Sequence, residues 1–435
     1  MINEQKNAVD IHLRNHKSNS NKSNNNNNNN DNIIEENDLI IVKYSADKGK
    51  HVIAKTQIPK GDYVSFREKP FVATVNFKDP FEKEICHRCF IYFDNKDSHD
   101  SCSCQQCKSV FYCSEQCKEH DQYSHNLQCG FLKKLLSASL FDHEIKTLMK
   151  MIVKILVQNH IDDISDSNNN NNSSSPLNST TLLLKDIFKL VSNKDRFTSQ
   201  RIGDFVKAFR FIEKSCFGGL QQDHPLLKSF GVVDSKSLEF QNKMIELMCI
   251  LECNAHEIGI TIPSNTNTCS YRYCSIGAGL YYTSSLFNHS CQPNISKIIE
   301  PGQSYGNHTM LAFKDIEMGE EICFNYIPIS LAFDDRQTKL LYSYFFKCAC
   351  PACLHVPKKT NNNKKNNNNN NNNNQFHNRF LKQYLCKKET CNGIITPFKV
   401  SPSSVNNTLT SLANDTHEQD IEYSCNICNP HILGN

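Results

Sequence analysis

The chain has 435 residues, enough for two or three domains with a sizeable core, and its formal net charge is only +3. This near balance of charge argues against a strongly basic nucleic-acid binder, and no apolar run reaches the roughly 18 residues of a membrane span. The polar segment from Met1 to Asn30 lacks the apolar core of a secretory signal, so we expect a cytoplasmic or nuclear location, or both.

Asparagine-rich stretches divide the chain at 24–30, 168–172 and 361–374. They offer no apolar side chains for burial, so we predict disordered insertions or linkers there. The first belongs to a predicted disordered tail at 1–37 and the last to a predicted Asn-rich linker at 356–375.

The segments between these stretches carry secondary-structure signals. Residues 45–76 show short β-strand patterns broken by turns, of which Ile58-Pro59-Lys60-Gly61 is the clearest. Apolar residues recur at helical spacing from Phe131 to Val157 and from Leu238 to Leu251. We therefore expect strands first and a mostly helical insert at about 130–250.

Cysteine is over-represented, with 22 copies, and clusters in short-spaced pairs. Between residues 86 and 129 the pairs are Cys86-x2-Cys89, Cys104-x2-Cys107, Cys113-x3-Cys117 and His125-x3-Cys129. A tight turn brings both ligands of such a pair to one side, so these pairs predict two closed tetrahedral zinc sites. Cys102 falls outside the pattern as a spare thiol. The alternative, scattered buried thiols, leaves the ordered spacing unexplained.

Two further cysteine groups lie downstream. The triplet Cys348-x-Cys350-x2-Cys353 supplies three ligands and needs a distant fourth to close a structural site. The alternative is a surface cluster of thiols. In the tail, the pairs are Cys386-x4-Cys391 and Cys425-x2-Cys428, with a long loop between them. Their ribbon-like spacing predicts another zinc site, and an unstructured tail with free thiols is the alternative.

Two motifs precede the triplet. The first, Asn288-His289-Ser290-Cys291-x-Pro293-Asn294, ends an apolar glycine-rich stretch that begins at Gly277, and the second runs from Gly319-Glu320-Glu321 to Tyr326. In this order they resemble the SET domain of methyltransferases. Segment 86–129, with its Tyr112-Cys113-Ser114-x2-Cys117, resembles a MYND zinc finger. Residues 38–355 thus look like a member of the SET and MYND domain-containing (SMYD-type) protein lysine methyltransferase family.

The resemblance implies an α+β fold in which the SET-domain β-structure contains a threaded, pseudoknot-like crossing. The SET domain is then split into parts at 38–85 and 251–330, with the MYND finger at 86–129 and the helical insert, including its Asn-rich loop, at 130–250 between them. A post-SET zinc segment at 331–355 and a C-terminal four-cysteine segment at 376–435 complete the predicted organisation.

The resemblance also implies which residues share each zinc ion. Cys86, Cys89, Cys113 and Cys117 hold one ion, and Cys104, Cys107, His125 and Cys129 hold a second. Cys291 joins Cys348, Cys350 and Cys353 on a third, whereas a fourth site in the tail is predicted from its cysteine spacing alone. One departure is Gln122, which stands where the family usually carries Trp. It bears on the finger's groove for proline-rich peptides more than on its zinc sites.

S-adenosylmethionine is the cofactor that the resemblance implies. Methyl transfer from a sulfonium is an in-line displacement, which needs an aligned and uncharged amine, and burial in an aromatic channel lowers a lysine pKa. Tyr326 is the expected catalytic residue, where the lysine channel meets the cofactor pocket. The expected cofactor contacts are Lys48, Lys50, Asn254, Asn288, His289, Tyr326 and Phe346. Relatives carry a glycine at the position of His51, and His tolerates positive φ less easily.

Two interpretations follow. The leading one is a monomeric enzyme that methylates lysines of histone or non-histone proteins, and the presence of Asn288, His289 and Tyr326 favours it. The alternative is an inactive SET scaffold whose MYND finger recruits partners, which His51 favours slightly. For individual positions, the alternatives are core packing of Tyr326 and Phe346 and a solvated turn around Lys48 and Lys50. A DNA-contacting regulator is disfavoured by the near-neutral charge.

Overall fold

The computed structural model describes thirteen stretches of the chain, all within the structural unit Glu36–Asn435. They are 39–76, 82–93, 102–169, 184–217, 225–228, 230–231, 234–263, 271–298, 306–328, 331–354, 385–388, 394–399 and 421–425. The predicted tail at 1–37 and linker at 356–375 lie outside the described residues, as do Cys391 and Cys428. Helices and strands are both abundant, as the α+β prediction requires.

The N-terminal strands alternate with tight turns. They are β1 (Ile40–Ser45), β2 (Gly49–Ala54), β3 (Tyr63–Glu68) and β4 (Val72–Val75), and β1 pairs antiparallel with β2. The predicted turn before β3 is present, because the amide of Asp62 donates to the carbonyl of Pro59 at 3.1 Å. Gly61 in this turn has φ +89°, a conformation that favours glycine.

The two largest sheets of the described residues are antiparallel and three-stranded, with strand orders β3-β9-β8 and β4-β6-β5. The additional strands are β5 (Ala255–Pro263), β6 (Tyr271–Leu280), β8 (Ile295–Ile298) and β9 (His308–Ala312). The glycine-rich end of β6 lies against β4, where a Cβ on Gly277 would come within 2.4 Å of the Thr74 carbonyl oxygen. The absence of a side chain therefore permits this pairing.

A short parallel pair joins the two sequence motifs. β7 (Asn288–His289) pairs with β10 (Cys323–Phe324), just after the 3₁₀ turn η4 (Ser284–Leu286). The side chain of Asn294 accepts from the amide of Cys323 at 2.8 Å and donates to the carbonyl of Glu321 at 2.8 Å. The Asn-His and Gly-Glu-Glu motifs thus lie side by side, whereas the threaded crossing stays a prediction.

The cysteine-rich segment leads directly into a helix. The short 3₁₀ helix η1 (Glu82–Glu84) comes first, and α2 (Glu115–Ser137) is then capped by Ser114, whose hydroxyl accepts from the amide of Cys117. His125 and Cys129 lie four residues apart on one face of α2, so this helix crosses the predicted boundary at 129/130.

The predicted helical run from Phe131 to Val157 is two helices. α2 ends at Ser137, and α3 (His143–Asn169) begins after Asp142, whose carboxylate accepts from the amide of Ile145 at 2.8 Å. This cap gives the second helix its own start.

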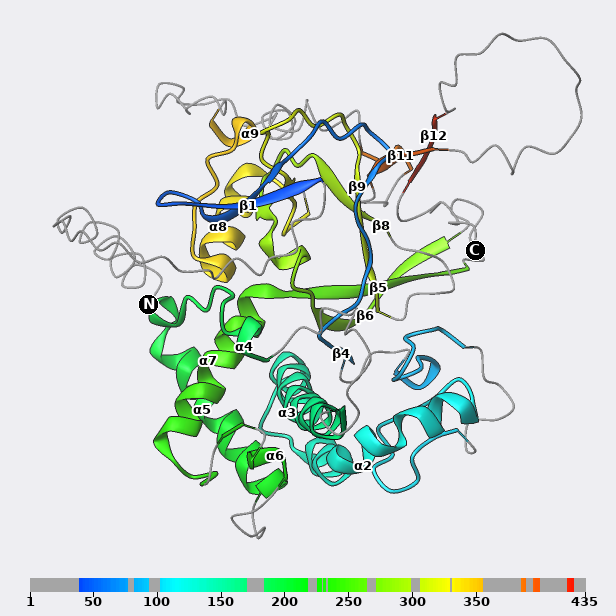
Figure 1. The fold of residues 1–435 in the computed structure, drawn as a ribbon, viewed down its shortest axis with the longest axis vertical. Coiled ribbons are helices and arrows are strands. Elements are labelled where there is room, and N and C mark those ends of the chain that lie inside the picture. The colour runs from blue at the N-terminus through cyan, green and yellow to red at the C-terminus, as the bar shows by residue number, and fades with distance from the viewer. Residues whose placement is uncertain are drawn as a thin grey trace, which may run out of the picture. The chain divides into compact units, whose positions relative to one another are not determined.

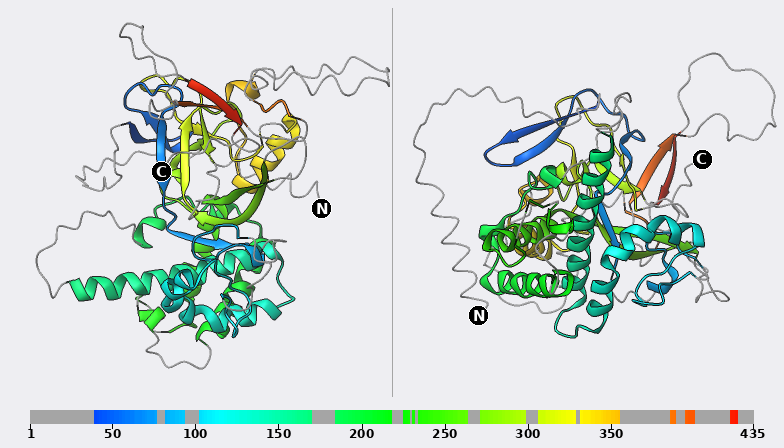
Figure 2. Two further views of the ribbon diagram at one scale, coloured as in Figure 1. Left: turned by 90° about the vertical axis from the view of Figure 1, so that its right-hand side faces the viewer. Right: turned by 60° about the horizontal axis from the view of Figure 1, so that its bottom comes forward.

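The remaining helices of the insert cover one side of the strands (Figures 1 and 2). They are α4 (Leu184–Ile187), η2 (Lys194–Arg196), α5 (Ser199–Ile212), the π-helical turn η3 (Glu213–Phe217), α6 (Pro225–Lys228) and α7 (Leu238–Asn254). Their core contains Phe205, Phe209 and Phe240, all at most 3% exposed. Lys150 and Lys154 of α3 donate to the carbonyls of Val75 and Ala73 at 2.7 and 2.9 Å. They thereby cover the edge strand β4.

The C-terminal elements are shorter. They include α8 (Phe333–Tyr344) and α9 (Pro351–Leu354), and the end of α8 reaches the helical insert, where Arg196 donates to the carbonyl of Phe345 at 3.0 Å. β11 (Ile395–Lys399) and β12 (Ile421–Cys425) form an antiparallel pair that brings Cys425 opposite Ile395.

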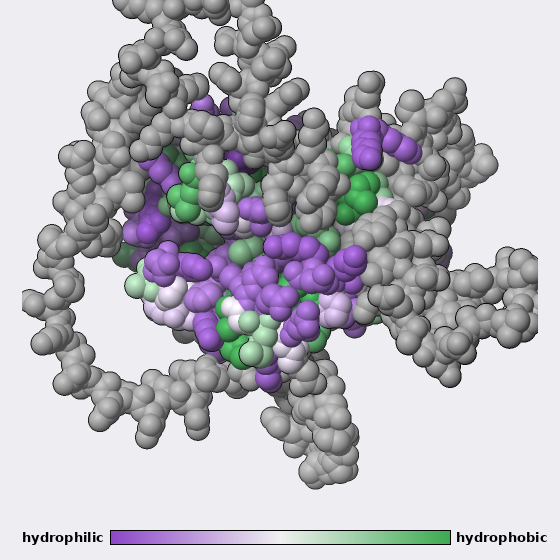
Figure 3. All heavy atoms as spheres, turned by 90° about the horizontal axis from the view of Figure 1, so that it is seen from above, coloured by the Kyte–Doolittle hydropathy of each residue, from purple (hydrophilic) through white to green (hydrophobic). Residues whose placement is uncertain are grey.

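One face of the molecule is largely polar among its described residues. On the face shown in Figure 3, the coloured residues are mainly hydrophilic, with smaller hydrophobic areas between them. None of the helices in the described part of the chain is both long and apolar enough to cross a bilayer.

Candidate functional site

The first cysteine group lies where the finger meets the start of α2. The sulfurs of Cys86, Cys89, Cys113 and Cys117 all fall within 4.8 Å of one another, and Cys113 lies 3.6 Å from both Cys89 and Cys117. Zn–S bonds of about 2.3 Å in a tetrahedron separate two sulfurs by about 3.8 Å, whereas a disulfide needs about 2.05 Å. The geometry therefore fits zinc and excludes disulfides.

The second group alternates with the first along the chain. Cys104, Cys107, His125 and Cys129 converge, with 3.7 Å between the sulfurs of Cys104 and Cys129 and 3.8 Å from the sulfur of Cys107 to Nε2 of His125. Both groups contain the ligands that the MYND resemblance implies. Cys102 stays outside them, with its sulfur 3.7 Å from a carboxylate oxygen of Glu115.

The third group joins distant parts of the chain. Cys291 lies 3.9 Å from Cys348 and 3.6 Å from Cys353, measured between sulfurs, and Cys350 completes the set. Cys291 is fully buried, as a closed structural site requires. The distant fourth ligand that the triplet needs is thus in place.

The tail site is only partly within the described residues. Cys386 follows Leu385, which bridges to Ile394 next to β11, and Cys425 ends β12. Two of the four predicted ligands therefore lie near the start of β11, Cys386 beside the bridge to Ile394 and Cys425 opposite Ile395. Because Cys391 and Cys428 lie outside the described residues, zinc binding here stays a prediction.

Tyr326 lies beside the third cysteine group. Its hydroxyl donates to the carbonyl of Phe287 at 2.8 Å, and its amide donates to Nδ1 of His289 at 3.0 Å. Its ring centroid is 4.9 Å from that of Tyr344, 5.4 Å from that of His289 and 6.5 Å from that of Phe346. Burial raises the pKa of the Tyr326 phenol, yet the side chain is only half-buried. The residue therefore remains partly accessible to solvent.

A polar cluster adjoins β7. Nζ of Lys48 lies 2.6 Å from a carboxylate oxygen of Glu321, and this hydrogen bond raises the pKa of Lys48. The side-chain amide of Asn288 lies within 3.4 Å of the Lys48 carbonyl and of Glu321. The structure thus brings Lys48 and Asn288 together and gives the Lys48 cation a carboxylate partner.

Lys50 and Asn254 both bind backbone carbonyls of the segment that follows α4. Lys50 donates to the carbonyl of Lys189 at 3.0 Å, and Asn254 donates to that of Val191 at 2.7 Å. His51 lies within β2, is buried, and has no positive φ, whereas Gly49 before it has φ +69°. Replacing the family's glycine by His51 therefore costs no backbone strain.

Glu321, Tyr344 and Glu68 of this region were not predicted from the sequence. Glu321 lay within a quoted motif, and its charge next to a lysine-bearing turn was a usable signal. No signal in the sequence marked Tyr344 beyond its aromatic character. Glu68 is held by the amides of Thr283 and Ser284 at 2.7 and 3.0 Å, and burial raises the pKa of its carboxyl. It fixes the turn that leads into β7.

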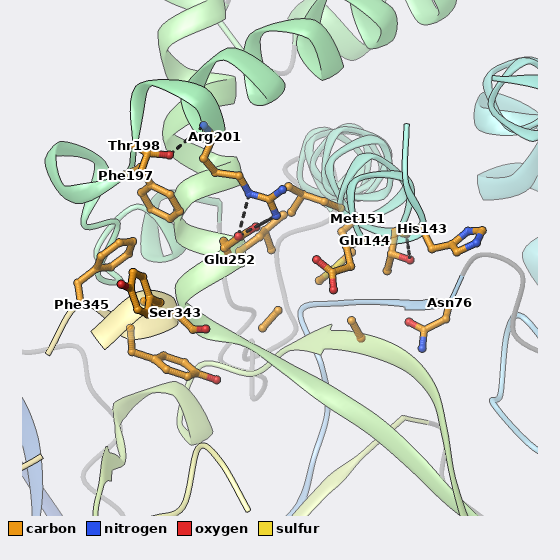
Figure 4. A pocket seen from close by; sticks show the side chains of 17 residues that line it. Asn76, His143, Glu144, Met151, Phe197, Thr198, Arg201, Glu252, Ser343 and Phe345 are labelled. Carbon is orange, nitrogen blue, oxygen red and sulfur yellow. Dashed lines mark hydrogen bonds and ion pairs between the residues drawn. The ribbon is translucent and has the colours of Figure 1, made fainter. Parts of the chain in front are cut away.

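A cavity of about 750 Å³ lies between the helical insert and the end of α8 (Figure 4). The helical insert forms one wall, where Arg201 pairs with Glu252 at 2.8 Å, and the end of α8 forms another. Tyr344 lines this cavity and also contacts Tyr326. The rings of Phe197 and Phe345, 4.8 Å apart, close one end.

The arrangement of motifs, strands and cysteine groups agrees with comparisons to known proteins. A family profile described as SET domain matches residues 49–327. The chain therefore belongs to the SET-domain family. Within that family it is one of the SET and MYND domain-containing proteins, which confirms the resemblance seen in its sequence.

Individual relatives support this assignment. One SET and MYND domain-containing protein of Dictyostelium discoideum is 28% identical over 408 residues, which are 89% of this chain and 95% of that protein. Another from that organism is 23% identical over 422 residues, 89% and 94% of the two chains. The histone-lysine N-methyltransferase SMYD3 of Mus musculus is 24% identical over 310 residues, 71% of this chain and only 60% of SMYD3.

Proposed function

We propose that this protein is an S-adenosylmethionine-dependent methyltransferase that acts on lysine side chains of proteins. Membership of the SET-domain family and similarity to SMYD3, named a histone-lysine N-methyltransferase, support methyl transfer. The observation that carries the proposal is the cluster of Tyr326, His289 and Phe346 beside the buried Cys291 group.

The proposed cofactor contacts surround this cluster. Asn254, Asn288 and His289 occupy the ends of α7 and β7, and their polar atoms already hold neighbouring backbone in place. Phe346 presents a ring 5.9 Å from that of His289, suited to packing against an adenine. When bound, the cofactor supplies an electrophilic methyl group on a sulfonium.

The chain's own residues then prepare the lysine. The hydroxyl and the amide of Tyr326 both donate hydrogen bonds, which fix the side chain in place. The hydroxyl oxygen can therefore orient the amine. Burial beside the touching rings of Tyr326 and Tyr344 disfavours the ammonium form and so lowers the lysine pKa toward the neutral nucleophile. The same aromatic faces stabilise a methylated, cationic product. The cavity lined by Tyr344 has room for the residues that flank the lysine.

Zinc completes the proposal. Three groups of ligands fit three structural ions, and the tail cysteines would hold a fourth. The Cys291 ion would pin the loop after β7 to the segment after α8, which closes the proposed pocket. The MYND finger is proposed to bind proline-rich peptides of partner proteins, and the chain to act as a monomer.

Two measurements test the function. Calorimetry on the purified full chain should detect S-adenosylmethionine binding. A peptide array with labelled cofactor should then show methylation of lysine peptides that is lost when the lysine becomes arginine. Absence of cofactor binding in a protein that holds its zinc would contradict the proposal and leave the inactive scaffold.

A further inference from the structure

Arg336 in the first turn of α8 is the largest fully buried side chain of the described residues, at 1% exposure. Its Nε donates to the sulfur of Cys291 at 3.2 Å, and its Nη1 donates to the carbonyl of Leu331 at 2.5 Å. Its Nη2 has no hydrogen-bond partner, and no carboxylate in the described part of the chain pairs with it. This guanidinium therefore donates to two acceptors, the backbone carbonyl of Leu331 and the sulfur of Cys291.

The charge of Arg336 requires compensation. A guanidinium stays protonated in proteins, and burying an unpaired cation costs several kcal/mol. Four thiolates around a divalent zinc ion leave two excess negative charges, which are equally costly to bury alone. The negative charge of the Cys291 group and the positive charge of Arg336 thus compensate each other at hydrogen-bond distance.

A second donor meets the same sulfur. Because Nδ1 of His289 accepts from the amide of Tyr326, the ring proton is assigned to Nε2, which lies 3.3 Å from the sulfur of Cys291. One thiolate therefore receives hydrogen bonds from Arg336 and His289. Through His289 it is connected to the backbone of Tyr326.

Arg336 also lies on α8, the helix that ends at Tyr344 beside Tyr326. Its neighbour Gln337 exchanges two hydrogen bonds with the backbone of Cys348, at 2.9 and 3.1 Å. α8 is thereby attached to both halves of the ligand set, and its far end presents Tyr344 and then Phe346 to Tyr326.

We propose that Arg336 is the charge-compensating residue of the Cys291 metal group and, through it, a positioning residue for the methyl-transfer pocket. The positioning part rests on the proposed function, whereas the metal part does not. Hydrogen bonds to a metal-bound thiolate lower its basicity and protect it from protonation and ligand loss, and removing such outer contacts typically weakens metal binding by about 10- to 100-fold.

The first test compares Arg336→Met with Lys339→Met in the full chain. Lys339 lies exposed on the same helix, so its variant loses the same charge away from the metal group. With a chromogenic chelator, Arg336→Met should release one of the zinc ions at least about tenfold faster than wild type. Lys339→Met should match wild type. Arg336→Lys, which keeps the charge but not the planar fork, should fall between them.

A thermodynamic cycle separates charge compensation from packing. In the native background, Arg336→Met should lower the unfolding midpoint. In a Cys291→Ser background the thiolate is gone, so Arg336→Met should leave the midpoint unchanged or raise it by removing an unpaired buried cation. An equal loss in both backgrounds would show that Arg336 only fills space and would overturn the proposal, as would zinc release at the wild-type rate in Arg336→Met.

The positioning role has its own readout. Arg336→Met should weaken S-adenosylmethionine binding and lower kcat, and excess zinc should restore both. If zinc release responds but no methyl transfer is found for wild type, the metal role of Arg336 stands and the proposed function fails. If wild type is active and Arg336→Met keeps full cofactor affinity despite faster zinc release, the positioning role is wrong.

Discussion

Tyr326→Phe removes one hydroxyl from the centre of the proposed pocket. Its structural cost is the single hydrogen bond to the Phe287 carbonyl, about 1 kcal/mol, which in a unit of this size corresponds to a fall of about 1–2 °C in the unfolding midpoint. The ring contacts with His289, Tyr344 and Phe346 remain. The loss of alignment at the reacting amine should lower kcat by at least about 100-fold, with cofactor affinity nearly unchanged.

Tyr112→Phe is the matched control. Tyr112 lies in the finger, is 2% exposed, and donates its hydroxyl to a carboxylate oxygen of Asp121 at 2.8 Å. Its removal should cost at least as much stability, because hydrogen bonds to charged groups are stronger, while turnover stays at the wild-type level. Turnover of the two variants is compared in stopped methylation assays on a peptide selected from the array. Their unfolding midpoints are compared in thermal melts followed by circular dichroism. A Tyr326→Phe enzyme within tenfold of wild type, with full zinc content, would refute the assigned role.

Three further predictions concern metal, pH and the cavity wall. Cys348→Ser should lower the zinc content measured by elemental analysis by one ion and weaken cofactor binding, and an unchanged count would remove this ligand from the site. Because burial raises the pKa of Tyr326, its phenol keeps its proton at higher pH than free tyrosine. The pH profile of kcat/KM should therefore rise into the alkaline range as the lysine loses its proton, and a fall near pH 9 would contradict this. Glu252→Gln leaves Arg201 without its carboxylate where the two side chains are 28% and 23% exposed. It should lower the free energy of unfolding by about 1 kcal/mol in urea titrations, and a change below about 0.3 kcal/mol would mean that the pair contributes little.

The parts of the site that sequence analysis anticipated are those set by local spacing. Ligands separated by two or three residues can lie on one turn and face one ion, so the ligand pairs of the finger could be predicted from their spacing. Asn288, His289 and Tyr326 came from motifs whose internal order is short and specific. In the structure these motifs form the parallel pair β7–β10.

Residues that act over long sequence separations left no such signal. Arg336 reaches Cys291 across 45 positions, and Glu68 reaches Ser284 across 216. Each looks like an ordinary surface charge in the sequence, because charged residues are rarely buried without a partner. The division of one apolar run into α2 and α3 was missed for a related reason, since both sides of the break have the same helical periodicity and only Asp142 marks the new start.

The helical insert and the region around Tyr326 are stabilised by different interactions, so we expect metal removal to affect them differently. The helical insert has a core of packed phenylalanines and aliphatic residues such as Phe205, Phe240 and Leu247. Around Tyr326, by contrast, the buried cluster has five members, of which three are the cysteines at 291, 348 and 353. Aliphatic burial of that size contributes little compared with a structural zinc ion. Chelation should therefore release the proposed pocket at concentrations that leave the helical insert folded, because the core around Tyr326 is built largely from metal ligands whereas the core of the insert is built from apolar side chains.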